Sequence, residues 1–118
     1  MKISTMQELL DAKVLTCEEN LDRHVYSACG CDLMSDVLAY VKDQAVLLTG
    51  LVNPQVVRTA VMMDMICIVF VRSKKPTEEV LELAKESGIV VMTTDKRLYD
   101  ACGILYSSGL VGNKVAKS

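Results

Sequence analysis

The sequence predicts a single α/β domain, a three-layer α/β/α unit around a mostly parallel sheet. Residues 45–49, 67–71 and 89–92 show no polar alternation and, apart from Thr49, are apolar, which is typical of strands buried on both faces. Helical patterns separate these runs, and that alternation predicts parallel strands with helices on both sides of the sheet. The chain has 118 residues, which matches the size of one typical domain.

The N-terminal part is expected to hold two helices and two extended runs. Apolar side chains in the first segment recur at helical spacing, and Ser4 or Thr5 is expected to cap that helix. In chain order, the expected elements are a helix at 5–12, an extended run at 13–16, a polar turn at 17–22, an extended run at 24–31 and a short helix at 34–41.

From residue 45 onward, strands and helices alternate. Asn53 is the expected cap of the first of these helices and Pro54 its first residue. Gly88 is expected to end the second helix, as glycine commonly does. The expected elements are a strand at 45–49, a helix at 54–64, a strand at 67–71, a helix starting near Pro76, a strand at 89–92 and a helix at 97–106.

The sequence shows no internal repeat or linker, so we expect one domain at residues 1–106 and a short polar tail at 107–118. The longest apolar run, at 65–71, is too short to cross a bilayer, and we expect no membrane partner. Five cysteines cannot all pair within one chain. Reduced thiols and a cytoplasmic location are therefore expected.

Charge and composition exclude one class of partner. The net charge is −2, aromatic residues make up 4% of the chain and tryptophan is absent. A general nucleic-acid binder needs a positive field, and single strands need aromatic platforms. We therefore expect no nucleic-acid partner.

The loops after the predicted strands hold the candidate ligand site. Ligands of parallel α/β sheets bind beyond the carboxyl ends of the strands, where cations and backbone N–H groups can hold an anion such as a phosphate. The alternative is that these polar residues only cap helices and form turns. The candidate residues are Gly50, Asn53, Arg72, Ser73, Lys74, Thr93, Thr94 and Asp95.

Motifs of catalysis are missing from the sequence. It holds no Gly-x-x-x-x-Gly-Lys-Ser/Thr loop, no Gly-x-Gly-x-x-Gly fingerprint and no Gly-x-Ser-x-Gly elbow. The single histidine, His24, lies beside Arg23 in a segment where a structural role is commoner than a catalytic one. The expectation is a protein that is not an enzyme and needs no cofactor.

The cysteines offer a separate chemical hypothesis. Cys29 and Cys31 are two residues apart, so a strand would place both on one face. Cys17 and His24 could complete a set of four metal ligands, although Cys-x-Cys is not the usual zinc spacing. A redox role or a metal site at Cys29 and Cys31 is therefore kept as an alternative.

Several stretches of the chain resemble the DRTGG domain family, over about residues 3–106 as a whole. The stretches lie at 7–16, 46–50, 75–84 and 88–94, and those at 32–38 and 99–106 resemble a subgroup of stand-alone members from anaerobic bacteria. The resemblance implies the fold of the N-terminal domain of HPr kinase/phosphorylase, a three-layer α/β/α unit. The family's name-giving residues are mostly lost here: Leu51-Val52 stand in place of its Asp-Arg pair, and residues 71–74 stand where its Thr-Gly-Gly is expected. A function specific to that motif therefore does not carry over to this chain.

The resemblance also implies a function. Family members occur as accessory domains, for instance in phosphotransacetylases and in pyrophosphatases with CBS domains, which implies regulation or dimerisation. Our leading hypothesis is therefore a non-enzymatic regulatory or interaction domain that forms a homodimer. The Met-rich segment from Val61 to Met65 is a candidate contact surface or part of the core. The alternative is a sensor of a small anion or nucleotide at the strand ends.

Overall fold

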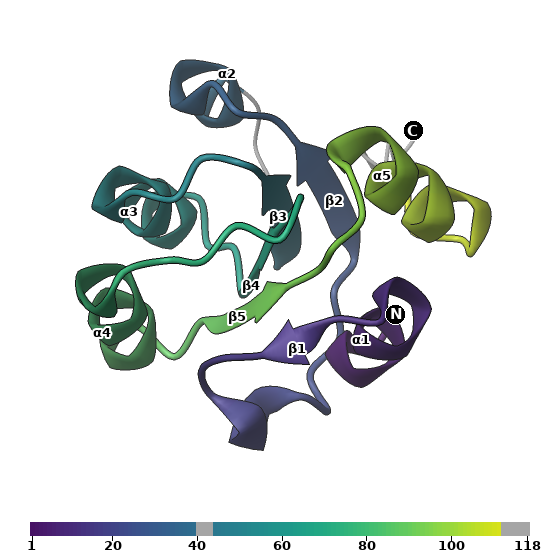
Figure 1. Cartoon of the computed structure of the whole chain (residues 1–118), viewed down its shortest axis with the longest axis horizontal. Helices are drawn as coiled ribbons and strands as arrows, with labels where there is room; N and C mark the ends of the chain where they lie inside the picture. The colour runs from purple at the N-terminus through teal and green to yellow at the C-terminus, as the bar shows by residue number, and fades with distance from the viewer. Residues whose placement is uncertain (40–43, 112–118) are drawn as a thin grey trace.

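The computed structural model describes residues 1–39 and 44–111. It contains a five-stranded sheet in the order β1-β5-β4-β3-β2, with helices on both sides (Figure 1). The elements are α1 (Ile3–Leu10), β1 (Lys13–Val14), the 3₁₀ turn η1 (Glu18–Asn20), β2 (Ser27–Gly30), α2 (Met34–Leu38), β3 (Ala45–Thr49), α3 (Pro54–Met62), β4 (Cys67–Phe70), α4 (Glu78–Glu86), β5 (Val90–Thr93) and α5 (Leu98–Ser107).

The predicted three-layer, mostly parallel α/β architecture is confirmed. Strands β2 to β5 pair in parallel, and β1 joins β5 antiparallel at one edge. Helices α2, α3 and α4 cover one face of the sheet, and α1 and α5 cover the other (Figure 1). No helix within residues 1–39 and 44–111 is long and apolar enough to span a bilayer.

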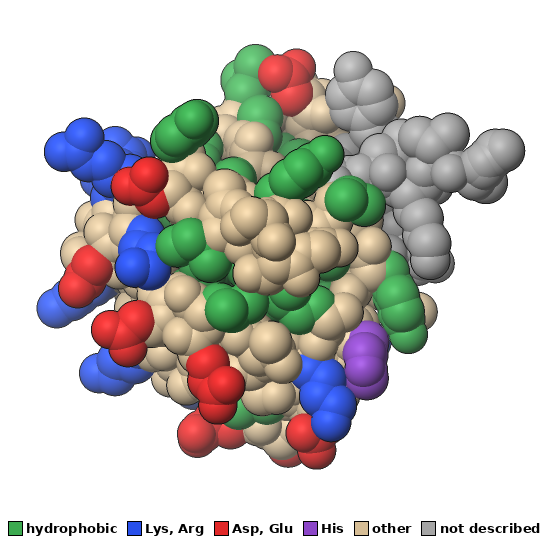
Figure 2. All heavy atoms as spheres, turned by 90° about the vertical axis from the view of Figure 1, so that its right-hand side faces the viewer, with side chains coloured by type: hydrophobic (Ala, Val, Ile, Leu, Met, Phe, Trp, Pro, Cys, Tyr) green, Lys and Arg blue, Asp and Glu red, His purple; other side chains and the backbone are tan. Residues whose placement is uncertain are grey.

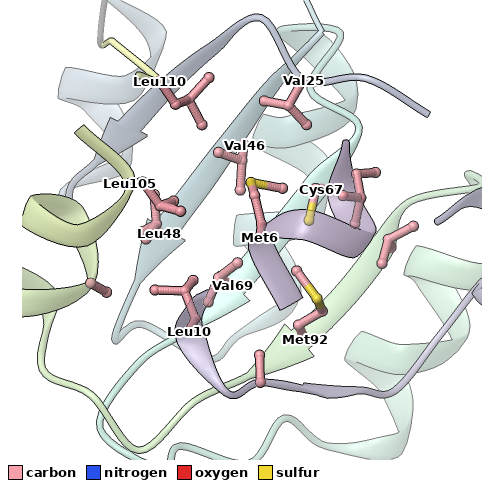
Figure 3. Close-up of a cluster of buried hydrophobic side chains, with 14 of the residues drawn as sticks. Met6, Leu10, Val25, Val46, Leu48, Cys67, Val69, Met92, Leu105 and Leu110 are labelled. Atoms are coloured by element: carbon pink, nitrogen blue, oxygen red, sulfur yellow. The ribbon is translucent and has the colours of Figure 1, made fainter. Parts of the chain in front are cut away.

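The sheet separates two buried apolar clusters. Because side chains alternate along a strand, Val46 and Leu48 of β3 face α1 and α5, whereas Leu47 faces α2 to α4. Figure 3 shows the first cluster, in which Met6 of α1 and Leu105 of α5 lie over the strands. Every residue of β3 is buried, which explains why its sequence shows no polar alternation.

The first helix starts earlier than predicted. It begins at Ile3, and its N-cap residue Lys2 makes no side-chain capping bond, so the prediction of Ser4 or Thr5 as cap is wrong. The amide of Ile3 donates to the carbonyl of Arg23, and that of Ser4 to the carbonyl of Leu21, both at 3.0 Å. A distant segment satisfies these amides, so no local cap is needed.

Two helix signals are confirmed at the residue level. Asn53 caps α3, where its Oδ1 accepts a hydrogen bond of 3.3 Å from the amide of Val56, and Pro54 is the first helical residue. Gly88 follows α4 in the left-handed region, with φ of +71°, which glycine adopts without strain. The predicted helix at 34–41 ends at Leu38 in the structure, and its positions 40 and 41 lie outside the described residues.

The chain after residue 106 folds back on the domain as far as it is described. Helix α5 continues to Ser107, and Leu110 is buried in the cluster under α1 and α5. The carbonyl of Val111 accepts a hydrogen bond of 3.1 Å from the amide of Ala28, at the edge of β2. Residues 112–118 of the predicted polar tail lie outside the described residues, and the domain boundary at 106 stays a prediction.

Candidate functional site

The loops that follow the four parallel strands meet at one edge of the sheet, which we call the strand-end edge. Parallel strands place all their carboxyl ends on the same side. All eight predicted ligand residues lie there. The edge is formed by Asp32 after β2, Gly50 and Asn53 after β3, Arg72, Ser73 and Lys74 after β4, and Thr93, Thr94 and Asp95 at the end of β5.

A guanidinium group lies over the end of β3. Gly50 is buried, and a Cβ atom placed there would collide with Nη2 of Arg72, so the guanidinium fills the space that a side chain would need. The Arg72 side chain is exposed. Within the described part of the chain no carboxylate lies at ion-pair distance from it; the ion pair seen there joins Lys85 and Glu82 on α4, at 3.7 Å. The Arg72 charge is therefore open to an anion.

The loop that carries this arginine is held by the loop after β5. Arg72 and Ser73 both adopt the left-handed conformation, with φ of +59° and +57°. The amide of Arg72 donates to the carbonyl of Lys96 at 2.8 Å, and the amide of Ser73 donates to that of Thr94 at 2.9 Å. The Ser73 hydroxyl donates to Oδ1 of Asp95 at 2.5 Å. These bonds compensate for a backbone conformation that non-glycine residues seldom adopt.

Three predicted ligand residues use their polar atoms inside the protein. The buried Thr94 hydroxyl donates to the carbonyl of Leu10, at the end of α1, over 2.7 Å. The Thr93 hydroxyl donates to the carbonyl of Lys74 over 2.8 Å. The Asn53 side chain caps α3. The contacts of these three side chains therefore agree with the alternative hypothesis, in which they cap helices and hold turns instead of binding a ligand.

Asp32 is a site residue that the sequence reasoning did not select. Its Oδ1 accepts hydrogen bonds from the hydroxyl of Thr49 at 2.9 Å and from the amide of Gly50 at 2.7 Å. The carboxylate thereby occupies a backbone donor that a ligand anion would otherwise use. Asp32 directly follows the second extended run in the sequence. Because a strand parallel to β3 ends at the same edge of the sheet, this position could have indicated that Asp32 lies at the strand-end edge.

The structure does not assemble the cysteine ligand set. Cys29 and Cys31 pack against the α2 to α4 cluster, whereas Cys17 packs in the cluster on the opposite face of the sheet. His24 is exposed and stacks on Tyr26. The described residues contain no group of three or more His, Cys, Asp or Glu side chains that could hold a metal ion. The geometry therefore lends no support to the metal hypothesis.

Burial also disfavours thiolate chemistry at three other cysteines. Burial raises the pKa of the fully enclosed Cys67 thiol well above its ordinary value. The pKa of Cys102 is raised by the same effect. The pKa of Cys17 is raised by burial first and by the nearby Glu19 carboxylate second. Since the thiolate is the reactive form, these raised pKa values disfavour thiolate chemistry. Cys67 is a core residue, and Cys17 and Cys102 pack partly buried against the same core.

Cavities among the described residues lie at the far end of the sheet, along α5 and between α5 and β2. One of about 340 Å³ lies at the opposite end of the sheet, with Arg23, Asp64 and Ser87 in its wall. A groove of about 450 Å³ runs along α5 from Lys96. An apolar space of about 180 Å³ lies between β2 and α5.

The family model of the DRTGG domain matches residues 5–108. The chain belongs to the DRTGG domain family. By the resemblance, the positions of the family's name-giving residues correspond to Leu51-Val52 and to residues 71–74 of this chain. In the structure, both segments lie at the strand-end edge, directly after β3 and β4. A search of curated proteins finds no match.

A solved structure confirms the DRTGG fold. The chain is similar to the CBS and DRTGG domains of the regulatory region of Clostridium perfringens pyrophosphatase, solved in complex with its activator, diadenosine tetraphosphate. The two share 17% sequence identity with a TM-score of 0.73, over 91% of this chain and 46% of that one. The chain thus spans just under half of the regulatory region, and at this identity the likeness shows the fold.

Proposed function

We propose that this DRTGG domain is a regulatory module that binds a small anionic ligand, a nucleotide, at the strand-end edge. The observation that carries the proposal is the Arg72 guanidinium, which lies over the bare backbone of Gly50 with no carboxylate at ion-pair distance within the described residues. The similar regulatory region from Clostridium perfringens is complexed with a dinucleotide activator, which supports a ligand of this class.

The charges at this edge favour phosphate. A guanidinium can bind two phosphate oxygens at once, and further cations follow in the same loops. Two carboxylates lie at the same edge, Asp32 bonded to Thr49 and Gly50 and Asp95 bonded to Ser73, and the cations outnumber them. The exposed cations of the loops after β4 and β5 are Arg72, Lys74, Lys75 and Arg97, with Lys96 half-buried beside them.

The same geometry supports binding without chemistry. The hydroxyls of Thr49, Thr93 and Thr94 donate to acceptors of the protein itself. The Ser73 hydroxyl donates to the Asp95 carboxylate, in a bond that holds the loop after β4 to the loop after β5. These four hydroxyls thus hold the edge together, and cations that bind an anion on such a frame suit a sensor. The proposed role is therefore regulatory and non-enzymatic.

Thermal unfolding with added nucleotides tests this function. A ligand that binds only the folded state at 100 times its Kd adds about 2.7 kcal/mol of stability. We expect ATP, GTP or diadenosine tetraphosphate to raise the Tm of the wild type, and Arg72→Gln to remove most of that rise. Arg58→Gln is the matched control, because Arg58 is an exposed arginine on α3. Equal responses of the two variants, or no response of the wild type, would overturn the proposal.

We further propose that the domain forms a homodimer through α2 and α3. Four large apolar side chains are exposed on these packed helices or directly before them: Leu33 (58%), which precedes α2, Leu38 (41%), Val61 (46%) and Met62 (69%). Within the Met-rich segment, Val61 and Met62 are exposed, while Met65 is buried in the core. Sedimentation equilibrium tests this at micromolar concentration. The wild type should sediment as a dimer and Met62→Asp as a 13.0 kDa monomer, whereas a monomeric wild type would refute it.

A further inference from the structure

The outer face of α5 carries a groove with an exposed aromatic ring. The groove measures about 450 Å³ and is lined by Lys96, Tyr99, Asp100, Gly103, Ile104 and Ser107. That volume falls in the range of small-molecule sites, roughly 300–1,000 Å³. Tyr99 is 88% exposed, which leaves nearly the whole ring open to a partner.

The helix period explains how the groove is formed. Tyr99, Gly103 and Ser107 are four residues apart, so they lie along one side of α5. Among the described residues, apart from the chain neighbours of Gly103 and the backbone of α5, no atom lies within 4 Å of where its Cβ would stand. The missing side chain leaves the groove open beside the tyrosine. Ile104, next to it, packs against the buried cluster and forms an apolar floor. Glycine inside a helix is less stable than alanine, so the stability of α5 does not explain why a glycine stands at this position.

The groove begins at the strand-end edge. The carbonyl of Lys96 accepts the amide of Arg72 at 2.8 Å, and the Thr94 hydroxyl accepts the amide of Lys96 at 3.3 Å. Tyr99, in the first turn of α5, lies three residues after Lys96 in the sequence. On the face shown in Figure 2, basic and acidic side chains lie side by side along the left-hand edge, with apolar side chains across the middle. Lys96 lines the start of the groove and Ile104 and Tyr99 its further course, so a cation leads into an apolar, aromatic surface.

We propose that the α5 groove binds the base of a nucleotide whose phosphates lie on Arg72 and Lys96. The inference rests on the proposed function and adds the part of the site that reads the base. A base can stack on the exposed ring of Tyr99, because every base presents a π-face. The Asp100 carboxylate, which accepts hydrogen bonds when ionised, favours a base with an amino group. The groove should thus prefer ATP or GTP to UTP.

Two exposed tyrosines on the same helix make a matched pair of variants. Tyr99 lines the α5 groove, whereas Tyr106, 66% exposed, lines the separate apolar space against β2. Calorimetric titration with ATP, UTP and inorganic tripolyphosphate separates base recognition from phosphate recognition. Tyr99→Ala should weaken ATP binding at least about fivefold, in line with the loss of aromatic stacking, and leave tripolyphosphate unchanged. Tyr99→Phe should restore ATP binding, and Tyr106→Ala should leave both probes unchanged.

The outcomes distinguish this inference from the function on which it rests. If ATP binding depends on Arg72 but Tyr99→Ala changes it less than twofold, the groove proposal falls and the proposed function stands. The same holds if tripolyphosphate binds as tightly as ATP. If neither probe binds the wild type, both fall. A change in sedimentation rather than in ATP affinity for Tyr99→Ala would show that this face contacts protein, which also overturns the groove proposal.

Discussion

The substitution Thr94→Val tests which of two adjacent threonines holds the strand-end edge together. Thr94 is 2% exposed, and its hydroxyl donates to the carbonyl of Leu10 at 2.7 Å and accepts the amide of Lys96 at 3.3 Å. It thus joins the end of α1 to the loop that carries Lys96. Valine keeps the shape of the side chain but leaves a buried carbonyl without its partner.

The expected loss follows from those two bonds. A buried acceptor left without a partner costs about 1–3 kcal/mol, and the amide of the half-buried Lys96 can turn to water at smaller cost. We expect Thr94→Val to lower the free energy of unfolding by about 2 kcal/mol. Thr93→Val is the control, because the Thr93 hydroxyl bonds to the exposed carbonyl of Lys74, which water can replace. Its loss should be about 0.5 kcal/mol.

Urea unfolding followed by far-UV circular dichroism measures both losses, since the chain has no tryptophan for fluorescence. For a domain of this size, 2 kcal/mol corresponds to a fall in Tm of about 8 °C. The m-value should stay unchanged, because neither substitution alters the surface exposed on unfolding. If Thr94→Val were no more destabilising than Thr93→Val, the hydroxyl would not hold the loop, and the argument for a preformed strand-end edge would fail.

Three further changes have defined outcomes. Phe70→Ala, in the buried strand β4, should cost about 3–5 kcal/mol in urea unfolding. Gly50→Ala should weaken nucleotide binding in calorimetry while changing stability little, because the new Cβ displaces only the flexible end of Arg72. The buried Cys67 thiol should resist iodoacetamide in the native state. Because burial raises its pKa in the folded protein, its contribution to the free energy of unfolding should be constant below the ordinary thiol pKa and decline above it. Urea midpoints measured across pH would show this.

Local signals in the sequence were sufficient for the central part of the fold. Strand β3 is buried along its whole length, so its apolar run could be recognised without knowing its neighbours. Helix α4 starts after Thr77, whose hydroxyl accepts the amide of Val80 at 3.4 Å, and it carries Glu78 and Glu79 in its first turn. Such caps and charges act within a few residues, which is why they can be read from one sequence.

Distant contacts decided the features that were missed. The start of α1 depends on the carbonyls of Leu21 and Arg23, which receive the first amides of the helix. The contact of α5 with β2 depends on Gly30, because a Cβ there would meet the sulfur of Cys102. Neither dependence appears in the local pattern, since the partners are far apart in the chain.

The strand-end residues show why residue type alone does not define a ligand site. Thr93 and Thr94 are adjacent and chemically alike, yet the second points into the protein and caps α1. A hydroxyl or amide can serve a ligand only if no internal group already occupies it. Applied to the eight candidates, this criterion sets aside Thr93, Thr94 and Asn53. It also sets aside Ser73 and Asp95, which bond to each other, and the amide of Gly50, which donates to Asp32. It retains Arg72 and Lys74, whose charged ends make no ion pair within the described residues. The groups at the strand-end edge that remain free to bind a ligand are therefore cations, and an anion is the ligand that matches them.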